Sequence, residues 1–186
     1  MGQRIIGGSR RGKKLHPLRG GIIRPTGDRQ KESIFNILSG NVNGAIVLDL
    51  FAGTGALGIE ALSRGANFAV FIDVHKPAIS LLNQNIESCG FEGQTQVIRW
   101  NIQKDLECLG TVRRKFNLVF MDPPYNKGYI EPTLRLLHRS GCLESDAVIV
   151  IEHAPQEPIP EDDFPYALYD KRRYGKTLVS FLVYVV

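Results

Sequence analysis

From residue 44 onward, short apolar runs alternate along the chain with amphipathic stretches of helical length. The apolar runs are nearly continuous in Val, Ile, Leu and Phe, which is the pattern of strands that are covered on both faces. The predicted strands are 45–50, 69–73, 96–100, 117–121 and 147–151. The predicted helices between them are 57–64, 77–89, 103–113 and 129–140. This alternation predicts an α/β domain in which helices cover both faces of a parallel sheet.

The end of the chain follows a different pattern. After a proline-rich loop at 154–165, two strand-like segments, 167–173 and 177–185, are separated by only three residues. Three residues cannot hold a crossover helix, so we expect these two strands to form an antiparallel hairpin. The predicted fold is therefore a doubly wound sheet of seven strands, mostly parallel, that ends in an antiparallel hairpin.

Ahead of the sheet, the segments 4–8 and 13–18 are predicted to pair as a small β-hairpin across a glycine-containing turn. A helix is predicted at 29–38, where apolar residues share one face. We expect Asp28 to cap this helix, with Glu32 near the position that a capping box uses.

The net charge of +4 is distributed unevenly. Residues 1–31 hold nine basic residues and one acidic residue, so this segment carries +8 and the other 155 residues carry −4. A basic arm on a mildly acidic globule is typical of proteins that bind phosphates, although a solvated tail is an alternative. We therefore divide the chain into a basic extension at 1–27 and a globular domain at 28–186. The residues predicted to contact phosphates are Arg4, Arg10, Arg11, Lys13, Arg24 and Arg29.

The sequence favours a cytosolic protein. Its longest apolar stretch, 178–186, is far shorter than the ~20 residues of a membrane-spanning helix. The basic N-terminal residues are not followed by the apolar stretch of a secretory signal. Cys89, Cys108 and Cys142 are odd in number and widely spaced, so we expect small buried apolar side chains rather than zinc ligands or a redox pair.

Residues 47–58 combine a predicted strand, a glycine turn and the start of a helix. Gly53 and Gly55 lack Cβ atoms where the backbone would approach a ligand closely. Asp73 ends the next predicted strand, 20 residues after Gly53, where a carboxylate can accept hydrogen bonds from two ribose hydroxyls. The residues predicted to bind a cofactor are Asp49, Phe51, Ala52, Gly53, Thr54, Gly55, Asp73 and Asn101.

The spacing of Gly53, Gly55 and Gly58 also fits a nicotinamide dinucleotide site, so the motif alone is weakly specific. Asp49 favours a different ligand, because a carboxylate at this strand end repels a pyrophosphate but suits a cationic sulfonium such as that of S-adenosylmethionine. The hairpin ending also argues against a dinucleotide fold. Asn101 follows the third predicted strand, where its amide could bind an adenine amino group or belong to an ordinary surface loop.

Residues 122–125, with the sequence Asp-Pro-Pro-Tyr, follow the fourth predicted strand at the sheet edge that borders the ligand crevice. An exocyclic purine amine is a poor nucleophile because its lone pair is delocalised into the ring. The Asp122 carboxylate and the Pro123 carbonyl could accept its protons, the two prolines would hold the loop, and Tyr125 could stack on the base. We predict that Asp122, Pro123, Pro124 and Tyr125 form a reaction centre for methyl transfer without a metal; a simple turn after the strand is the alternative.

Over essentially its whole length the sequence resembles the RsmD family of 16S ribosomal RNA guanine-N2 methyltransferases. The segments that carry the resemblance are 4–8, 24–29, 32–38, 49–58, 60–66, 122–125, 151–153, 174–177 and 180–181. The resemblance implies a Rossmann-like class I methyltransferase fold with S-adenosylmethionine as cofactor. It also implies that the target guanine lies at 122–125 and that the basic extension binds 16S rRNA. Because so small a protein has little surface with which to read a long RNA, we expect the substrate to be the assembled or assembling 30S subunit, and we expect the protein to be a monomer. Gly27 and Asn101 depart from the residues that are usual in the family.

Four other interpretations stay open at this stage. The enzyme could methylate adenine N6 or another RNA or DNA base, or a glutamine amide in a protein, although the basic extension argues against a protein substrate. It could be a nicotinamide-dependent oxidoreductase, or an RNA-binding assembly factor without catalysis. His153, beside Glu152, could line the base pocket, but a structural role is the more frequent one for such a histidine. The sequence does not identify the modified nucleotide.

Overall fold

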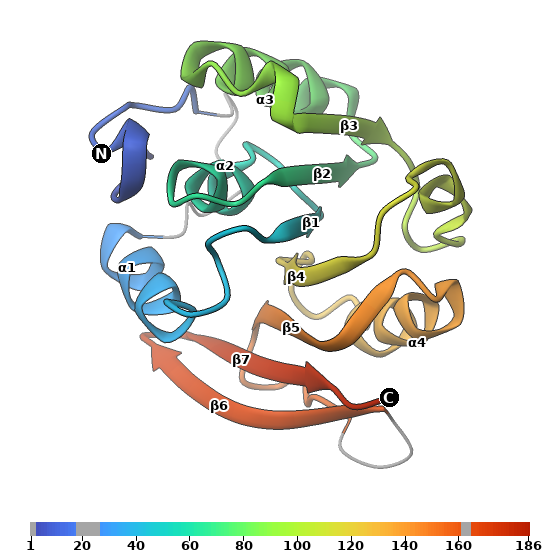
Figure 1. Ribbon diagram of the computed structural model, residues 1–186. Helices are drawn as coiled ribbons and strands as arrows, with labels where there is room; N and C mark the ends of the chain where they lie inside the picture. The colour runs from blue at the N-terminus through green and yellow to red at the C-terminus, as the bar shows by residue number, and fades with distance from the viewer. Residues whose placement is uncertain (1–2, 18–26, 161–164) are drawn as a thin grey trace.

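The computed structural model describes residues 3–17, 27–160 and 165–186, and it is built around one seven-stranded sheet (Figure 1). The sheet order is β3-β2-β1-β4-β5-β7-β6, and β7 runs antiparallel to both of its neighbours. The first five strands pair in parallel, so the predicted mostly parallel sheet with a terminal hairpin is confirmed. The strands are β1 (Ile46–Leu50), β2 (Phe68–Asp73), β3 (Thr95–Arg99), β4 (Phe116–Met121), β5 (Leu143–His153), β6 (Tyr166–Tyr174) and β7 (Thr177–Tyr184).

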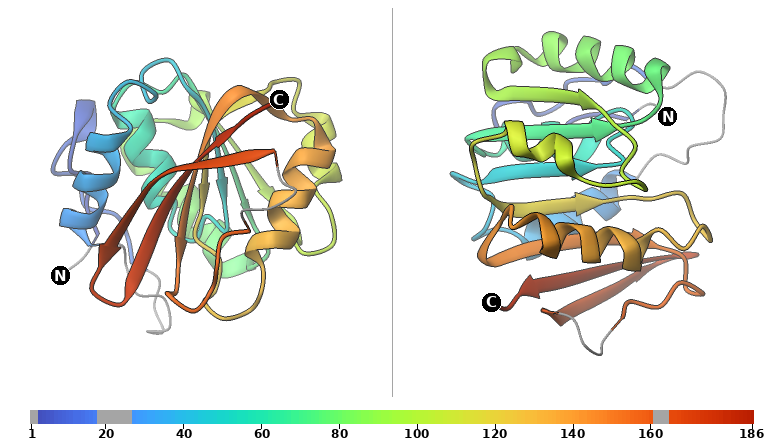
Figure 2. Two further views of the ribbon diagram at one scale, coloured as in Figure 1. Left: turned by 90° about the horizontal axis from the view of Figure 1, so that it is seen from below. Right: turned by 90° about the vertical axis from the view of Figure 1, so that its right-hand side faces the viewer.

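Helices cover both faces of the sheet (Figure 2). Helices α1 (Asp28–Ile37), α2 (Ala56–Ser63) and α3 (Lys76–Cys89) lie on one face, and α4 (Ile130–Ser140) lies on the other. Three 3-10 helices complete the described elements: η1 (Gly8–Arg10), η2 (Glu92–Gln94) and η3 (Glu107–Thr111).

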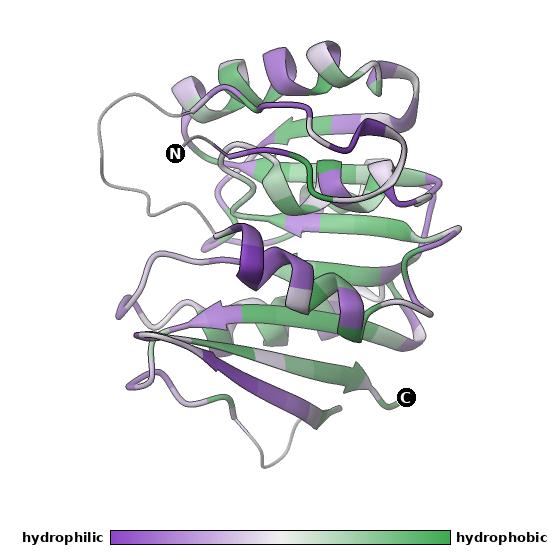
Figure 3. Cartoon of the chain, turned by 90° about the vertical axis from the view of Figure 1, so that its left-hand side faces the viewer, coloured by the Kyte–Doolittle hydropathy of each residue, from purple (hydrophilic) through white to green (hydrophobic). Residues whose placement is uncertain are grey.

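The central strands are buried on both sides, which explains their nearly continuous apolar sequence. In β1, Val47 packs into the core under α1, α2 and α3, whereas Leu48 and Leu50 pack into the core under α4 and η3. Successive side chains of a strand point to opposite faces, so one short strand contributes to two apolar layers. The edge strand β6 is largely exposed and hydrophilic (Figure 3), as expected for an edge that must not pair with other chains.

The predicted helix at 103–113 is wrong, because only the short 3-10 helix η3 forms there. The carboxamide oxygen of Asn101 accepts the backbone N–H of Gln103 at 3.1 Å. The carboxylate of Asp105 accepts the backbone N–H of Glu107 at 3.0 Å. Such local side-chain bonds compete with helical hydrogen bonding, and Gly110 further disfavours an α-helix.

The predicted cap of α1 is also wrong. Gly27 is the N-cap and makes no side-chain capping bond, while Asp28 is the first helical residue. The Asp28 carboxylate instead accepts a hydrogen bond from Arg4 Nε at 2.8 Å. An acid in the first turn still interacts favourably with the helix dipole.

The predicted N-terminal hairpin exists only as a short antiparallel pairing within residues 3–17. A single bridge joins Arg4 and Lys14, and the amide of Ile5 donates to the Lys13 carbonyl at 2.8 Å. The 3-10 helix η1 occupies part of the predicted turn. Ile5 and Leu15 are buried in the core beside α1 and α2, so this segment packs against the domain.

Cys89, Cys108 and Cys142 are all buried and unpaired, which confirms their prediction as small apolar side chains. Within the three described ranges, no helix is long and apolar enough to cross a membrane.

Candidate active site

The carboxyl ends of β1, β2 and β4 meet at one edge of the sheet, and most of the predicted site residues follow these strand ends. β1 pairs in parallel with both β2 and β4, with Leu50 opposite Ile72 on one side and Met121 on the other. The glycine loop after β1 and the Asp-Pro-Pro-Tyr corner after β4 therefore begin side by side. This proximity confirms the arrangement on which the sequence interpretation depends.

Asp49 lies beneath the glycine loop and is almost completely buried, with 3% of its surface exposed. Its Oδ2 accepts the backbone N–H of Gly58 in α2 at 2.9 Å. Burial raises the pKa of Asp49 to about 8, against the lowering effect of the Gly58 hydrogen bond and with a smaller raising effect from Asp73. A cationic group placed above the loop would favour the ionised form of this carboxylate.

The three glycines of the loop have different roles. Gly55 is the left-handed N-cap of α2, and an added Cβ would lie 2.3 Å from the Leu82 side chain. A Cβ on Gly58 would lie 2.3 Å from the Phe71 ring. Gly53 also has a positive φ of 54°, but a Cβ there would meet nothing closer than 3.9 Å. Gly55 and Gly58 thus serve packing of the loop and helix, and the open space for a ligand lies at Gly53.

Phe51 begins the loop with a φ of 60°, which is uncommon for a residue with a bulky side chain. Its ring stacks against Tyr129 with centroids 6.1 Å apart and an interplanar angle of 4°. The next residue, Ala52, donates its N–H to the Ile72 carbonyl at 3.0 Å. Strained backbone of this kind is held by its surroundings and is frequent in ligand-binding loops.

Asp73, at the end of β2, connects the second strand to the glycine loop. Its Oδ2 accepts the Gly53 N–H at 2.9 Å, and its Oδ1 accepts the His75 N–H at 2.8 Å. Each oxygen keeps a second lone pair, so these bonds leave acceptor capacity for hydroxyl donors. Asn101 follows β3 at the same edge, and its Oδ1 accepts the Gln103 N–H. The adenine-binding role of Asn101 stays a prediction.

The four residues of the Asp-Pro-Pro-Tyr corner differ in their exposure to solvent. Pro123 is buried, Asp122 is half-buried, and Pro124 and Tyr125 reach the surface. Burial raises the pKa of Asp122 well above its ordinary value, and the nearby Glu152 and Asp49 carboxylates raise it further.

The hydroxyl of Tyr125 is held by hydrogen bonds, while the residue as a whole is 37% exposed. The hydroxyl donates to Glu152 Oε1 at 2.8 Å and lies 3.0 Å from Thr177 Oγ1. Burial of the hydroxyl raises the pKa of Tyr125 above its ordinary value. Glu152 also accepts a hydrogen bond from Gln30 Nε2 of α1 at 2.7 Å. Glu152 and Thr177 were not predicted as site residues, because Glu152 lies near the end of β5 and Thr177 begins β7, both far in sequence from Tyr125.

His153 has a structural role. It is 1% exposed, its Nδ1 lies 2.8 Å from the Glu157 carbonyl oxygen, and its Nε2 lies 2.8 Å from Ser180 Oγ. Burial lowers the pKa of His153. The imidazole is therefore bonded on both nitrogens within the fold, as the more frequent role of such a histidine predicts.

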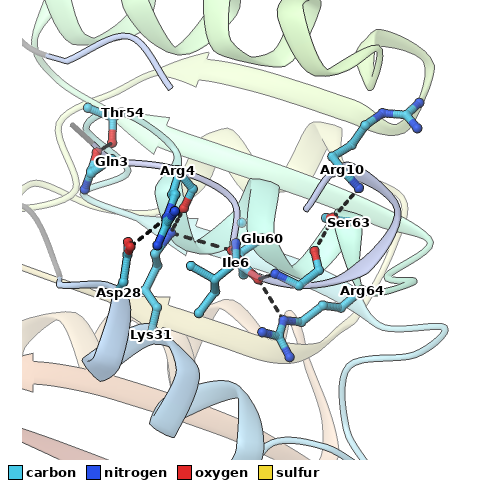
Figure 4. A network of polar contacts seen from close by, with 12 residues as sticks. Gln3, Arg4, Ile6, Arg10, Asp28, Lys31, Thr54, Glu60, Ser63 and Arg64 are labelled. Atoms are coloured by element: carbon cyan, nitrogen blue, oxygen red, sulfur yellow. Dashed lines mark hydrogen bonds and ion pairs between the residues drawn. The ribbon is translucent and has the colours of Figure 1, made fainter. Parts of the chain in front are cut away.

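The basic N-terminal segment is anchored on buried Glu60 of α2 (Figure 4). The Glu60 carboxylate accepts the N–H groups of Ile6 and Gly7, both at 2.8 Å. It also forms ion pairs with Arg64 Nε at 2.8 Å and with the fully buried Lys31 Nζ at 3.5 Å.

A second set of contacts joins this segment to the glycine loop. Thr54 Oγ1 donates to Gln3 Oε1 at 2.7 Å (Figure 4). Buried Asn85 of α3 donates to the Thr54 carbonyl at 3.0 Å and accepts the His16 N–H at 2.7 Å. The segment that is predicted to bind phosphates is therefore bonded to the loop that is predicted to bind the cofactor.

The predicted phosphate-contacting residues differ in their surroundings. Arg11, Lys13 and Arg29 are exposed, whereas Arg4 is paired with Asp28. Arg10 Nε donates to the Cys89 carbonyl at 2.6 Å, and its guanidinium lies 5.3 Å from the centre of the Phe91 ring. Arg24 lies outside the described residues.

Comparison with known proteins identifies close relatives over nearly the whole chain. The family model described as conserved hypothetical protein 95 matches residues 3–183. The chain is 36% identical over 181 residues to ribosomal RNA small subunit methyltransferase D of Escherichia coli, covering 97% of this chain and 88% of the relative. It is 36% identical over 187 residues to the protein of the same name from Haemophilus influenzae, covering 97% and 92%. The solved structure of Escherichia coli yhhF superimposes with a TM-score of 0.83 at 33% identity, covering 98% of this chain and 97% of that one.

Proposed function

The chain belongs to the RsmD family, whose model is described as conserved hypothetical protein 95, and on this premise we propose that it methylates 16S ribosomal RNA. The methyl donor is S-adenosylmethionine, which supplies an electrophilic methyl group on a sulfonium. We further propose that the acceptor is the exocyclic N2 of a guanine. The substrate is the assembled or assembling 30S subunit, because so small a protein has little surface with which to read a long RNA.

The observation that carries this proposal is the adjacency of two loops. The glycine loop leaves β1 and the Asp-Pro-Pro-Tyr corner leaves β4, and these strands are hydrogen-bonded neighbours with Leu50 opposite Met121. A ligand bound along the glycine loop would border a base held at the corner. Ligands of open α/β sheets bind at this edge, beyond the carboxyl ends of the strands.

The donor set of the glycine loop fits an adenosyl sulfonium ligand. The buried Asp49 carboxylate, whose pKa burial raises, would be stabilised by a cation and would repel a pyrophosphate. Asp73 retains acceptor capacity beside the loop, and Gly53 leaves open space. These features favour S-adenosylmethionine over a nicotinamide dinucleotide.

The corner after β4 fits a purine amine as methyl acceptor. The Asp122 carboxylate and the Pro123 carbonyl would accept the two N2 protons, so that the nitrogen lone pair localises toward the methyl carbon. The new nitrogen–carbon bond would form as the methyl–sulfur bond of the sulfonium breaks and leaves S-adenosylhomocysteine, and the surplus proton would pass from N2 to Asp122 and then to solvent. The half-exposed Tyr125 ring would stack on the extruded base, an interaction of ~1–3 kcal/mol per base.

The product of the reaction tests this proposal directly. Wild-type protein would be incubated with labelled S-adenosylmethionine and 30S particles that lack the modification, and the methylated nucleoside would be identified by mass spectrometry. We expect N2-methylguanosine in 16S rRNA. N6-methyladenosine would contradict the guanine assignment. Stabilisation by NAD but not by S-adenosylhomocysteine in a thermal-shift assay would contradict methyl transfer altogether.

We also propose that the exposed basic residues of the N-terminal segment bind rRNA phosphates. Replacing both Arg11 and Lys13 by alanine should weaken binding of the 30S particle and reduce the slope of log affinity against log salt by about 1–2. The backbone bonds of the segment would persist, because only exposed side chains are removed. Affinity measured over a series of salt concentrations gives this slope.

The matched control replaces Arg113 and Lys115, two exposed basic residues immediately before β4, at the edge of the sheet opposite the glycine loop. This double variant should keep the wild-type slope. An unchanged slope in the Arg11 and Lys13 variant would remove the N-terminal segment from the RNA interface.

A further inference from the structure

The proposed base site contains a second carboxylate that the methyl-transfer chemistry does not require. β4 and β5 pair in parallel up to Met121 opposite Ile151, so Asp122, the residue that follows β4, comes next to Glu152 of β5. Residues at matching positions of neighbouring strands direct their side chains to the same face of a sheet. Two acidic side chains therefore stand next to each other at the corner where the base is proposed to bind.

Glu152 is buried and held in a fixed position. Its residue is 7% exposed, its Oε1 accepts the Tyr125 hydroxyl at 2.8 Å, and its Oε2 accepts Gln30 Nε2 at 2.7 Å. A carboxylate has about four lone-pair sites on its two oxygens, so it can accept several donors at once. Since Tyr125 is the proposed stacking platform, a base on its ring would present its edge near this carboxylate.

Guanine and adenine differ at the edge that would face two carboxylates. Guanine carries the N1–H and the N2 amine side by side, and all of these hydrogens are donors. Adenine carries the N6 amine next to N1, and this N1 is an acceptor with a lone pair. One carboxylate suits either amine, but a second carboxylate beside it suits only guanine.

We propose that Glu152 is the residue that selects guanine, by accepting the N1–H while Asp122 accepts a proton of the N2 amine. This inference rests on the proposed function and deepens it by naming the group that reads the base. Adenine in the same position would direct its N1 lone pair at a buried carboxylate, leaving two acceptors without a hydrogen between them. A site built to bond a donor strongly rejects an analogue that lacks it.

The test uses 2-aminopurine, which keeps the amine on C2 but has an acceptor at N1. Once the modified nucleotide is mapped, 30S particles are reconstituted with guanine or 2-aminopurine at that single position. Wild-type protein should prefer guanine by at least about 100-fold in kcat/KM, because the 2-aminopurine N1 faces Glu152. In the Glu152→Gln variant the side-chain amide can donate to N1, so the preference should fall to within about tenfold.

The matched control is Thr177→Val, which removes the other hydroxyl contact of Tyr125 but leaves the Glu152 carboxylate in place. This variant should keep the wild-type preference, even if its absolute rate falls. If Glu152→Gln is too slow to assay on both particles, the ratio of its affinities for the two particles, measured with S-adenosylhomocysteine present, provides the same comparison.

The outcomes separate this inference from the proposed function. A wild type that forms no N2-methylguanosine would overturn both. A wild type that forms it, together with a Glu152→Gln variant that keeps the full preference for guanine, would overturn only the role of Glu152 and would show that it merely supports Tyr125. A loss of preference in Thr177→Val equal to that in Glu152→Gln would lead to the same conclusion.

Discussion

Replacing Asp122 by alanine is expected to lower kcat for methylation of the 30S particle by about 10³-fold, with little change in the affinity for S-adenosylhomocysteine. The variant loses the carboxylate that we propose accepts the N2 proton, so the amine lone pair would stay delocalised in the ring. The cofactor affinity should persist because the glycine loop is fixed by Asp49, Asp73 and α2 rather than by Asp122. Single-turnover kinetics and calorimetric titration measure the two quantities separately.

The pH profile of the Asp122→Asn variant distinguishes catalysis from a structural effect. Asp122 accepts a proton only when ionised, and burial together with Glu152 and Asp49 raises its pKa. Wild-type kcat should therefore fall with decreasing pH at a midpoint well above 3.8, the ordinary value for an aspartate. Asparagine keeps one carbonyl acceptor in nearly the same shape but does not titrate. We expect partial activity in this variant and loss of that acid limb.

Two results would contradict this assignment of Asp122. Full activity of Asp122→Ala would remove the carboxylate from the reaction. An acid limb that is the same in Asp122→Asn and in the wild type would show that another group titrates, because the asparagine amide has no proton to gain in this range.

The sequence was sufficient to predict the sheet and the two loops of the site, because both follow from strong local signals. Five apolar runs and a three-residue connection define the strands, since a strand buried on both faces tolerates few polar residues. The glycine spacing and the Asp-Pro-Pro-Tyr corner follow strands directly, and the carboxyl ends of parallel strands share an edge. Asp49 and Asp122 could therefore be predicted from the sequence to lie at one site.

Predictions failed where side chains compete with the backbone for hydrogen bonds. The stretch 103–113 has amphipathic character, but Asn101 and Asp105 bind nearby amides and leave only the short η3. Aspartate is a common helix-capping residue, yet the Asp28 carboxylate instead accepts a hydrogen bond from Arg4, 24 residues earlier in the chain. Long-range partners of this kind leave no periodic trace in the sequence.

The position of Glu152 at the candidate site could not be predicted for the same reason. Its contacts come from Tyr125, 27 residues earlier in the chain, and from Gln30 in α1, 122 residues earlier. The apolar pattern identifies β5 but says nothing about which residue of another element meets its end. The position of Glu152 beside Asp122 follows only from the pairing register of β4 and β5, once these two strands are known to be neighbours.

The attachment of the basic segment was equally hard to predict. A run of basic residues reads as a solvated arm, yet the segment 3–17 is bonded to Glu60, Asn85 and Thr54. Lys31, counted among the basic residues of that run, is fully buried. Basic residues that we propose contact RNA and basic residues that stabilise the fold therefore alternate along this segment, and only their surroundings in the structure distinguish the two kinds.

Replacing Glu60 by alanine is expected to lower the free energy of unfolding by about 3–5 kcal/mol, because it removes the carboxylate that forms an ion pair with the buried Lys31 ammonium and leaves that ammonium bonded to the Arg4 carbonyl. The same change removes the acceptor of the Ile6 and Gly7 amides. Chemical denaturation monitored by circular dichroism measures the effect. The control is Glu131→Ala, which breaks the exposed i,i+4 pair with Arg135 and should cost no more than about 0.5 kcal/mol.

The pH dependence of this destabilisation tests its cause. Burial lowers the pKa of Lys31 from its ordinary 10.5, and Glu60 raises it back in part. Between the folded pKa and 10.5 the unfolded state binds more protons than the folded state, so stability rises with pH across that window. Without Glu60 the folded pKa of Lys31 falls further and the window extends to lower pH. The stability difference between Glu60→Ala and the wild type should therefore shrink as pH rises from neutrality toward 10. A difference that stays constant over this range would attribute the loss to the Ile6 and Gly7 hydrogen bonds alone, and Lys31 would then have no energetic dependence on its partner.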